Sequence, residues 1–142
     1  MLGGQLVRLT FGPNDDYPVW SPDGQEIAYE VDDNGRHSIR RRSLDGRQPE
    51  ETLYANEAYQ FYVPIDWSPD GKYLSMHLSN KEGRYSNWSL PLEGGGQAFR
   101  PGATSALTVS EYEGRFSADG HWLCYFAYET GRPEVYVVPF PG

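Results

Sequence analysis

The sequence predicts an all-β protein made of three repeats, and three observations support this prediction. Nearly the same stretch occurs twice, as VWSPDGQEIAY from Val19 and as DWSPDGKYLSM from Asp66, and a less regular copy, RFSADGHWLCY, begins at Arg115. Each copy runs into residues that alternate between apolar and polar, which is the period of a β-strand. The 142 residues include 16 Gly and 11 Pro, a turn-rich composition, and no segment shows a convincing helical period.

Two independent landmarks give the length of the repeat. The turn serines Ser21, Ser68 and Ser117 lie 47 and 49 residues apart. The later segments IRRRSLDG, NWSLPLEG and VYVVPFPG each start 48 residues after the one before. Random turns would not keep two registers at once, so we interpret residues 1–142 as one domain with repeats at about 11–54, 55–103 and 104–142.

Each repeat begins with an aromatic residue and a tight turn of sequence SPDG or SADG. Proline presets the backbone at the first corner, aspartate can bond its own backbone, and glycine supplies the left-handed position. The third copy has Ala118 where the others have proline, so its turn should be less rigid. The structural turn residues are Trp20, Asp23, Gly24, Trp67, Asp70, Gly71, Phe116, Asp119 and Gly120.

An alternating strand follows each turn. One face carries Ile27, Tyr29 and Val31, and the other repeats match it in register with Leu74, Met76, Leu78, Leu123, Tyr125 and Ala127. On the other face, Ala28, Ser75 and Cys124 are small, which suggests that another layer approaches closely there.

The rest of each repeat predicts two further strands. Asn34-Gly35 is a strong hairpin signal. A third strand is expected at about 38–44, 86–92 and 134–140, and a weaker fourth strand at Thr52–Tyr54 and Gln97–Arg100. Four short antiparallel strands, repeated every 40–50 residues or so, are typical of the blades of a β-propeller.

The copies WSPDGQEIAY, WSPDGKYLSM and FSADGHWLCY, with the segments that follow them, closely resemble the TolB-type, WD40-like β-propeller repeat of bacteria over about residues 5–142. The resemblance is specific for the fold and unspecific for function. It implies a non-catalytic scaffold that binds a protein or peptide, with partners in a membrane-associated Tol–Pal type system.

Two other resemblances give alternative functions. The ending GRPEVYVVPFPG is similar to propellers fused to bacterial serine/threonine kinases, which implies a sensor or docking module. The propeller of the prolyl oligopeptidase family is also similar, which implies a substrate-gating role. In each case the catalytic domain would lie outside this chain.

Three blades do not comfortably close a ring, because a propeller typically has four to eight blades. Two blade faces would stay uncovered and would favour association. Residues 5–10 occupy the place of the outer strand of a neighbouring blade. We therefore expect a partial or half ring, either as part of a longer propeller or as a homodimer in which each chain's residues 5–10 complete the other's third blade.

Chemistry within the chain is not expected. The net charge of −8 disfavours nucleic-acid binding. The three histidines do not coincide in the repeat frame, so no metal site is predicted, and DDNG at residues 32–35 is interpreted as a hairpin turn. The turn serines recur as structural residues, and nucleophile elbows and phosphate loops are missing from the sequence. We predict no catalytic residues, no metal and no cofactor.

Two other short patterns receive structural interpretations. Asn87 of the sequon NWS falls on a predicted strand, which disfavours glycosylation. Arg40–Arg42 also falls on a strand, where we expect a solvated or ion-paired face.

A partner site is predicted at one end of the ring. The segments before the innermost strands and the second hairpin turns should meet there, at about 11–18, 31–37, 56–66, 79–86, 103–114 and 128–133. Aromatic residues beside charges are typical of interfaces, although the tyrosines could instead pack between blades. The candidate partner-binding residues are Asp16, Tyr17, Tyr59, Tyr62, Asp66, Glu111 and Glu113. Among them, Asp16, Asp66 and Glu113 near the mouth of the channel would favour a cationic peptide or a bound cation.

The cellular compartment is not decided by the sequence. A signal peptide is not visible, no run is long enough for membrane insertion, and one cysteine allows no intrachain disulfide. A periplasmic or cell-envelope location is what the TolB resemblance implies.

Overall fold

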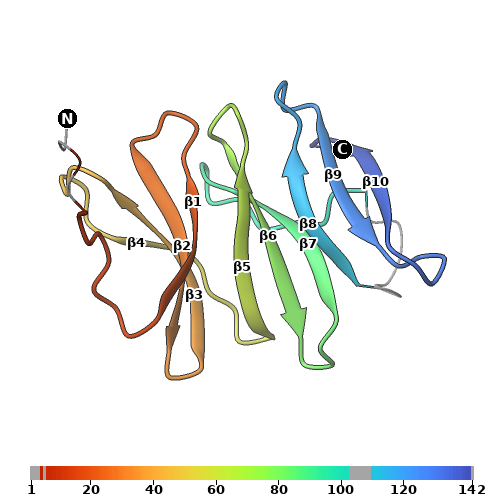
Figure 1. Cartoon of the computed structure of the whole chain (residues 1–142), viewed down its shortest axis with the longest axis horizontal. Helices are drawn as coiled ribbons and strands as arrows, with labels where there is room; N and C mark the ends of the chain where they lie inside the picture. Colours follow the sequence, from red (N-terminus) through yellow and green to blue (C-terminus); the bar gives the residue numbers. More distant parts are fainter. Residues whose placement is uncertain (1–3, 5, 103–109, 142) are drawn as a thin grey trace.

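The computed structural model describes residues 4, 6–102 and 110–141, and it confirms the all-β prediction. The strands form three antiparallel sheets that stand side by side in chain order (Figure 1). The first sheet, blade 1, contains β1 (Asp15–Trp20), β2 (Glu26–Asp33), β3 (Arg36–Ser43) and β4 (Glu51–Tyr54). Blade 2 contains β5 (Tyr59–Trp67), β6 (Tyr73–Asn80) and β7 (Tyr85–Pro91), and blade 3 contains β8 (Glu111–Phe116), β9 (Trp122–Ala127) and β10 (Glu134–Pro139).

The repeated turn has the same geometry in all three blades. In blade 2 the Ser68 hydroxyl donates to Asp70 Oδ1 over 2.6 Å, the Lys72 N–H donates to the same oxygen over 3.0 Å, and Gly71 has a φ of +77°. Blades 1 and 3 repeat these contacts around Asp23 and Asp119. These bonds hold the pKa of each aspartate below its ordinary value. The serine and aspartate of each turn therefore hold its backbone in place.

The main core lies between blades 1 and 2. Leu74, Met76 and Leu78 on β6 pack toward Ala28 and Ile39 of blade 1. The predicted face of β2 made by Ile27, Tyr29 and Val31 forms a second cluster, which is covered in part by Leu9. The strand β6 is buried along almost its whole length, because blades flank it on both faces.

The fourth strands are less regular than the first three. Blade 1 has β4 where Thr52–Tyr54 was predicted, but Gln97–Arg100 forms only an isolated bridge between Ser89 and Phe99. At the edge of β7, where a fourth strand would bond the backbone, two side chains accept its N–H groups instead. Glu111 accepts a hydrogen bond from the Asn87 N–H over 3.2 Å, and Ser110 accepts one from the Tyr85 N–H over 3.2 Å.

Residues 6–10 form no strand within the chain. Their predicted pairing with a neighbouring blade would need a second molecule and stays a prediction. Gln5 and residues 103–109 lie outside the described residues, so the predicted boundary between the second and third repeats falls there too.

Two of the predicted surface features are confirmed. Arg40 pairs with Glu50 over 2.8 Å, and Arg41 pairs with Glu51 over 2.8 Å, so the arginine run is an ion-paired face. Asn87 lies on β7 and is buried.

Candidate functional site

The innermost strands β1, β5 and β8 neighbour one another across the three blades. Each is interrupted by a bulge, between Asp16 and Val19, between Pro64 and Asp66, and between Tyr112 and Arg115. In blades 1 and 3 the bulge contains a residue other than glycine in the left-handed region, Tyr17 at φ 52° and Glu113 at φ 58°. The middle blade has Pro64 at the aligned position, where the ring excludes a positive φ.

All seven predicted partner-binding residues lie on these innermost strands. The segments before the innermost strands were predicted as loops, and this was wrong for residues 15–18, 59–66 and 111–114, which belong to β1, β5 and β8. Residues 103–109 of the third segment lie outside the described residues. Alternation was hard to recognise there because each bulge shifts the apolar period by one residue. The seven residues belong to three different blades.

The acidic residues predicted at the mouth are largely engaged within the chain. Asp66 accepts a hydrogen bond from the Phe116 N–H over 2.8 Å, and Glu113 pairs with Arg115 over 3.2 Å. Glu111 pairs with Arg100 over 2.7 Å. Asp16 alone of these makes no hydrogen bond or ion pair with the described residues, so the cationic-partner hypothesis now depends on Asp16.

The tyrosines divide into structural and accessible members. Tyr62 is buried, and its hydroxyl accepts a hydrogen bond from the Asn56 N–H over 3.0 Å while it donates to the Asn56 carbonyl. Tyr17 is half exposed and meets the ring of Phe61 edge to face, with centroids 6.0 Å apart. Tyr59 is half-buried and meets Trp88 in the same way at 5.8 Å.

A hollow of about 730 Å³ lies between blades 1 and 2 at the predicted end of the ring. It brings the β2–β3 hairpin turn next to the segment that leads into β5, as the sequence predicted for that end. Its lining includes Gly35, Arg36, His37, Ala55, Asn56, Glu57, Tyr59, Gln60 and Tyr62.

A second hollow of about 460 Å³ adjoins the first and shares Ala55, Asn56 and Tyr59 with it. It adds the more apolar residues Leu53, Tyr54, Trp88, Leu90 and Ala98. We call the two hollows together the inter-blade groove. We call the hollow beside Arg36 and His37 the polar part of the groove and the hollow beside Trp88 and Leu90 the apolar part, and Tyr59 lines both.

A buried carboxylate supports the polar part of the groove. Glu30 on β2 is 2% exposed, and its Oε1 lies 2.5 Å from Nδ1 of His37. Burial raises the pKa of Glu30, and the hydrogen bond to His37 opposes that rise. Because Nδ1 is held in this way, Nε2 is the ring nitrogen of His37 that has no polar partner among the described residues. Sequence reasoning missed this pair, although a glutamate within an apolar strand was a visible signal.

Polar side chains of blade 2 bond the backbone of β8 at the interface between blades 2 and 3. His77 on β6 accepts a hydrogen bond from the Glu113 N–H, Ser75 donates to the Gly114 carbonyl, and Asn87 accepts from the Gly114 N–H over 3.2 Å. Burial lowers the pKa of His77 to about 4, although the charge of Glu113 opposes this shift. These side chains position the bulge of β8, and a smaller hollow of about 170 Å³ lies between the turns of blades 2 and 3.

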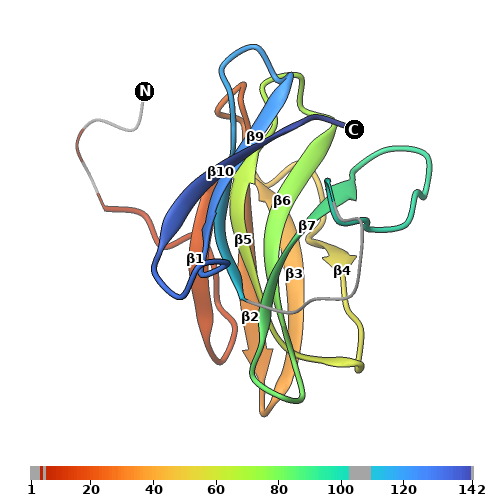
Figure 2. The same ribbon diagram turned by 90° about the vertical axis from the view of Figure 1, so that its right-hand side faces the viewer.

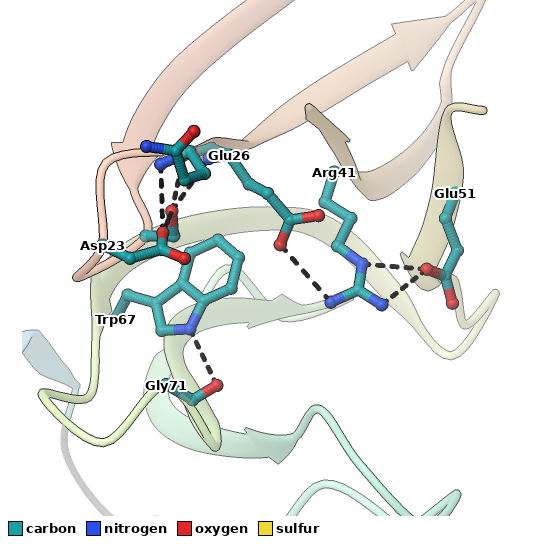
Figure 3. Close-up of polar contacts among 8 residues, drawn as sticks. Asp23, Glu26, Arg41, Glu51, Trp67 and Gly71 are labelled. Carbon is teal, nitrogen blue, oxygen red and sulfur yellow. Dashed lines mark hydrogen bonds and ion pairs between the residues drawn. The ribbon is translucent and has the colours of Figure 1, made fainter. Parts of the chain in front are cut away.

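A third hollow, of about 490 Å³, lies between blades 1 and 2 at the opposite end, beside the SPDG turns. Figure 3 shows that Arg41 reaches between Glu26 and Glu51, beside Trp67, whose Nε1–H donates to the Gly71 carbonyl over 3.1 Å. Two carboxylates already neutralise this arginine, which makes the hollow a poor site for an anion.

The described residues contain neither a metal-binding cluster nor a membrane-spanning helix. No group of three or more His, Cys, Asp or Glu side chains is arranged to hold a metal ion there. No helix in the same part of the chain is long and apolar enough to cross a membrane.

Comparison with known proteins identifies the fold. No family model matches the chain. The Tol-Pal system protein TolB of Alcanivorax borkumensis is 38% identical over 63 residues, which is 44% of this chain and 14% of that protein. This match makes the chain a distant relative of TolB over that stretch.

Solved structures extend the match to all three blades. TolB from Acinetobacter baumannii gives a TM-score of 0.70 at 23% identity over 91% of this chain, and a putative TolB from Agrobacterium tumefaciens gives 0.73 at 20% over 92%. The chain spans 30% and 47% of those two structures. A structure from an analysis of two prolyl endopeptidases matches 85% of the chain and 19% of its own length, with a TM-score of 0.63 at 19% identity. The chain therefore has a TolB-like β-propeller fold and corresponds to part of a propeller.

Proposed function

We propose that this TolB-like propeller segment is a non-catalytic binding module that holds a linear peptide, or an extended segment of a protein, in the inter-blade groove. The observation that supports the proposal is the pair of adjoining hollows that meet at Tyr59, the first containing Asn56 and Gln60 and the second Trp88 and Leu90. Together they are larger than one side chain needs, so they suit several consecutive residues of a peptide.

The chemistry of the groove fits this class of ligand. The amide side chains of Asn56 and Gln60 can both donate and accept hydrogen bonds, as a peptide backbone requires. Nε2 of His37 can accept a further N–H when the ring is neutral. The apolar part beside Trp88 and Leu90 can take an aliphatic or aromatic side chain, and aromatic residues supply much of the binding energy at such sites.

A selection from a phage-displayed library of linear peptides tests the proposal. Peptides selected on the whole chain are synthesised with a fluorescent label, and their binding is measured by polarisation. Tyr59→Ala should weaken binding about tenfold or more, because Tyr59 contributes to both parts of the groove. The matched control is Tyr128→Ala, which removes an exposed tyrosine of blade 3 outside the groove and should leave the affinity unchanged.

Two results would overturn this proposal. The first is a selection that recovers no binder. The second is a set of peptides that bind Tyr59→Ala as tightly as the unmodified chain while far-ultraviolet circular dichroism shows that both proteins are folded.

A second candidate function is the substrate-gating propeller of a peptidase. It is favoured by the similarity of the fold to the solved prolyl endopeptidases. A hydrolase domain encoded next to this segment would support the gating role. Flanking sequence that encodes no hydrolase would exclude it.

A further inference from the structure

The outward face of blade 3 is apolar and uncovered. Val135 and Val137 on β10 are 76% and 57% exposed, and Trp122 on β9 is also exposed. Within the described residues β10 pairs with β9 alone, so its other edge carries unpaired backbone groups. Viewed from this end of the molecule, β9 and β10 stand in front of the other sheets (Figure 2). An exposed apolar strand at a sheet edge is a template for another strand.

The interface between blades 1 and 2 shows what covers the equivalent face of another blade in this chain. On blade 1, Ala28 and Ile39 occupy the repeat positions of Cys124 and Val135, and the apolar face of blade 2 buries both of them. The open face of blade 3 thus has the chemistry of a surface that receives the apolar face of a following blade.

The outward face of blade 1 is such an apolar face, and it is incompletely covered. Trp20 is 59% exposed, whereas Trp67 at the same repeat position is 7% exposed because blade 1 packs against it. Leu44 is exposed, whereas the corresponding Phe140 of blade 3 is buried. Trp20 and Leu44 are therefore accessible at this first end, whereas Ile27, Tyr29 and Val31 of the same face are buried, with Leu9 packed against them.

The first end also carries an unpaired segment. Residues 6–10, LVRLT, form no strand, and the side chain of Leu6 is fully exposed. This segment and the open edge of β10 lie at opposite ends of the row of blades, as the positions of the two termini show (Figure 1). They cannot meet within one molecule.

We propose that a second copy of this chain covers the open face of blade 3. Blade 1 of each copy packs on blade 3 of the other, and residues 6–10 of each copy add a strand to the edge of β10 in the other. Each copy makes the same set of contacts with the other, so a two-fold axis relates the two copies and closes the assembly at a dimer. This inference is independent of peptide binding, because the inter-blade groove lies within one copy.

Light scattering coupled to size exclusion tests the assembly on the whole chain. The expected mass is twice 16.1 kDa. Val137→Glu places a charge on the open face and should convert the protein to a folded monomer. The matched control is Lys81→Gln, which changes the net charge by the same amount in the β6–β7 turn of the middle blade and should leave the mass unchanged.

Alkylation of Cys124 gives a second readout. Cys124 is half-buried on the outward face of blade 3, so a second copy would cover it. Its reaction with N-ethylmaleimide should slow as the concentration of the unmodified protein rises, and should not depend on concentration in Val137→Glu. A folded monomer of 16.1 kDa at all concentrations, or a dimer that Val137→Glu leaves intact, would overturn the proposal.

Discussion

Two buried titratable residues, Glu30 and His77, occupy the same position of the repeat and have different tasks. His77 accepts the N–H of Glu113 in the bulge of the next blade. The residue aligned with Glu113 in the middle blade is Pro64, which has no N–H to donate. Glu30 therefore faces no backbone donor and pairs with His37 of its own blade. The bulge residue thus determines which partner the buried residue of the preceding blade bonds.

The buried imidazole predicts a dependence of stability on pH. The pKa of His77 falls from 6.5 in the unfolded chain to about 4 in the folded protein, because burial disfavours the charged form. The folded state binds fewer protons between these two values, so the contribution of His77 to stability is full above pH 6.5, declines as the pH falls from 6.5 to about 4, and changes no further below that. The free energy of unfolding should drop by up to about 3 kcal/mol over this range through His77 alone.

Urea denaturation of the wild-type chain and of His77→Gln, at pH 7 and at pH 4.5, measures this contribution. The glutamine can still accept the Glu113 N–H but does not titrate. The difference between the two proteins should appear at the acid pH and be small at pH 7. If both proteins lost the same amount of stability between pH 7 and pH 4.5, the acid sensitivity would come from groups other than His77.

At the scale of the elements, the repeated turn was predictable and the sheet edges were not. The contacts of Ser68, Asp70 and Gly71 all lie within a few residues of one another, so their sequence specifies them directly. The side chain of Glu111 acts on β7 from 24 residues away, and the Glu113 N–H reaches His77 across 36 residues. Such contacts depend on how blades stack and on bulges, which local periodicity does not reveal.

The turn of blade 3 predicts a stabilising substitution. Ala118 stands where the other blades have Pro22 and Pro69, and its turn has the same hydrogen bond, from the Gly120 N–H to the Ser117 carbonyl over 2.9 Å. Ala118→Pro should raise the free energy of unfolding by about 0.4–1 kcal/mol, mainly because it restricts the unfolded chain. Thermal and urea denaturation measure the change.

Ala118→Gly is the control for the turn, and it should lower the stability through the opposite effect on the unfolded chain. A proline variant less stable than the wild type would show that blade 3 does not tolerate the backbone geometry of the other two turns.

At the scale of the whole molecule, the arrangement of blades predicts a gradient of local stability. The strand β6 is buried between two other blades, whereas the short strand β4 is an outer edge with exposed residues at its start. Amide hydrogen exchange should therefore be slowest in β6 and much faster in β4. Exchange measured by mass spectrometry on Val137→Glu tests this in a single copy, and equal rates in the two strands would contradict it.

The overall architecture could be inferred from the sequence because the same pattern of turns and strands occurs three times. The registers of the turn serines and of the third strands fixed three blades and their order. The groove could not be inferred, because Tyr59, His37 and Trp88 come from separate elements and meet only when two blades pack together. The seven residues predicted for partner binding contribute Tyr59 and Tyr62 to it, and the binding role of the others stays a prediction.

The contrast between the two blade interfaces has a consequence for how such a chain avoids misassembly. Three similar repeats could in principle stack in the wrong order, or with repeats of another copy, as often happens in repeat proteins. Blade 1 has the apolar residues Ala28 and Ile39 where blade 2 has Ser75 and Asn87, so it lacks two of the side chains that bond the backbone of the β8 bulge. Against another blade, Ser75 and Asn87 of blade 2 would lose these partners. Buried polar groups without partners cost stability, so each interface recognises its own neighbour. The differences between the repeats thus encode the order of assembly, just as their similarities encode the fold of each blade.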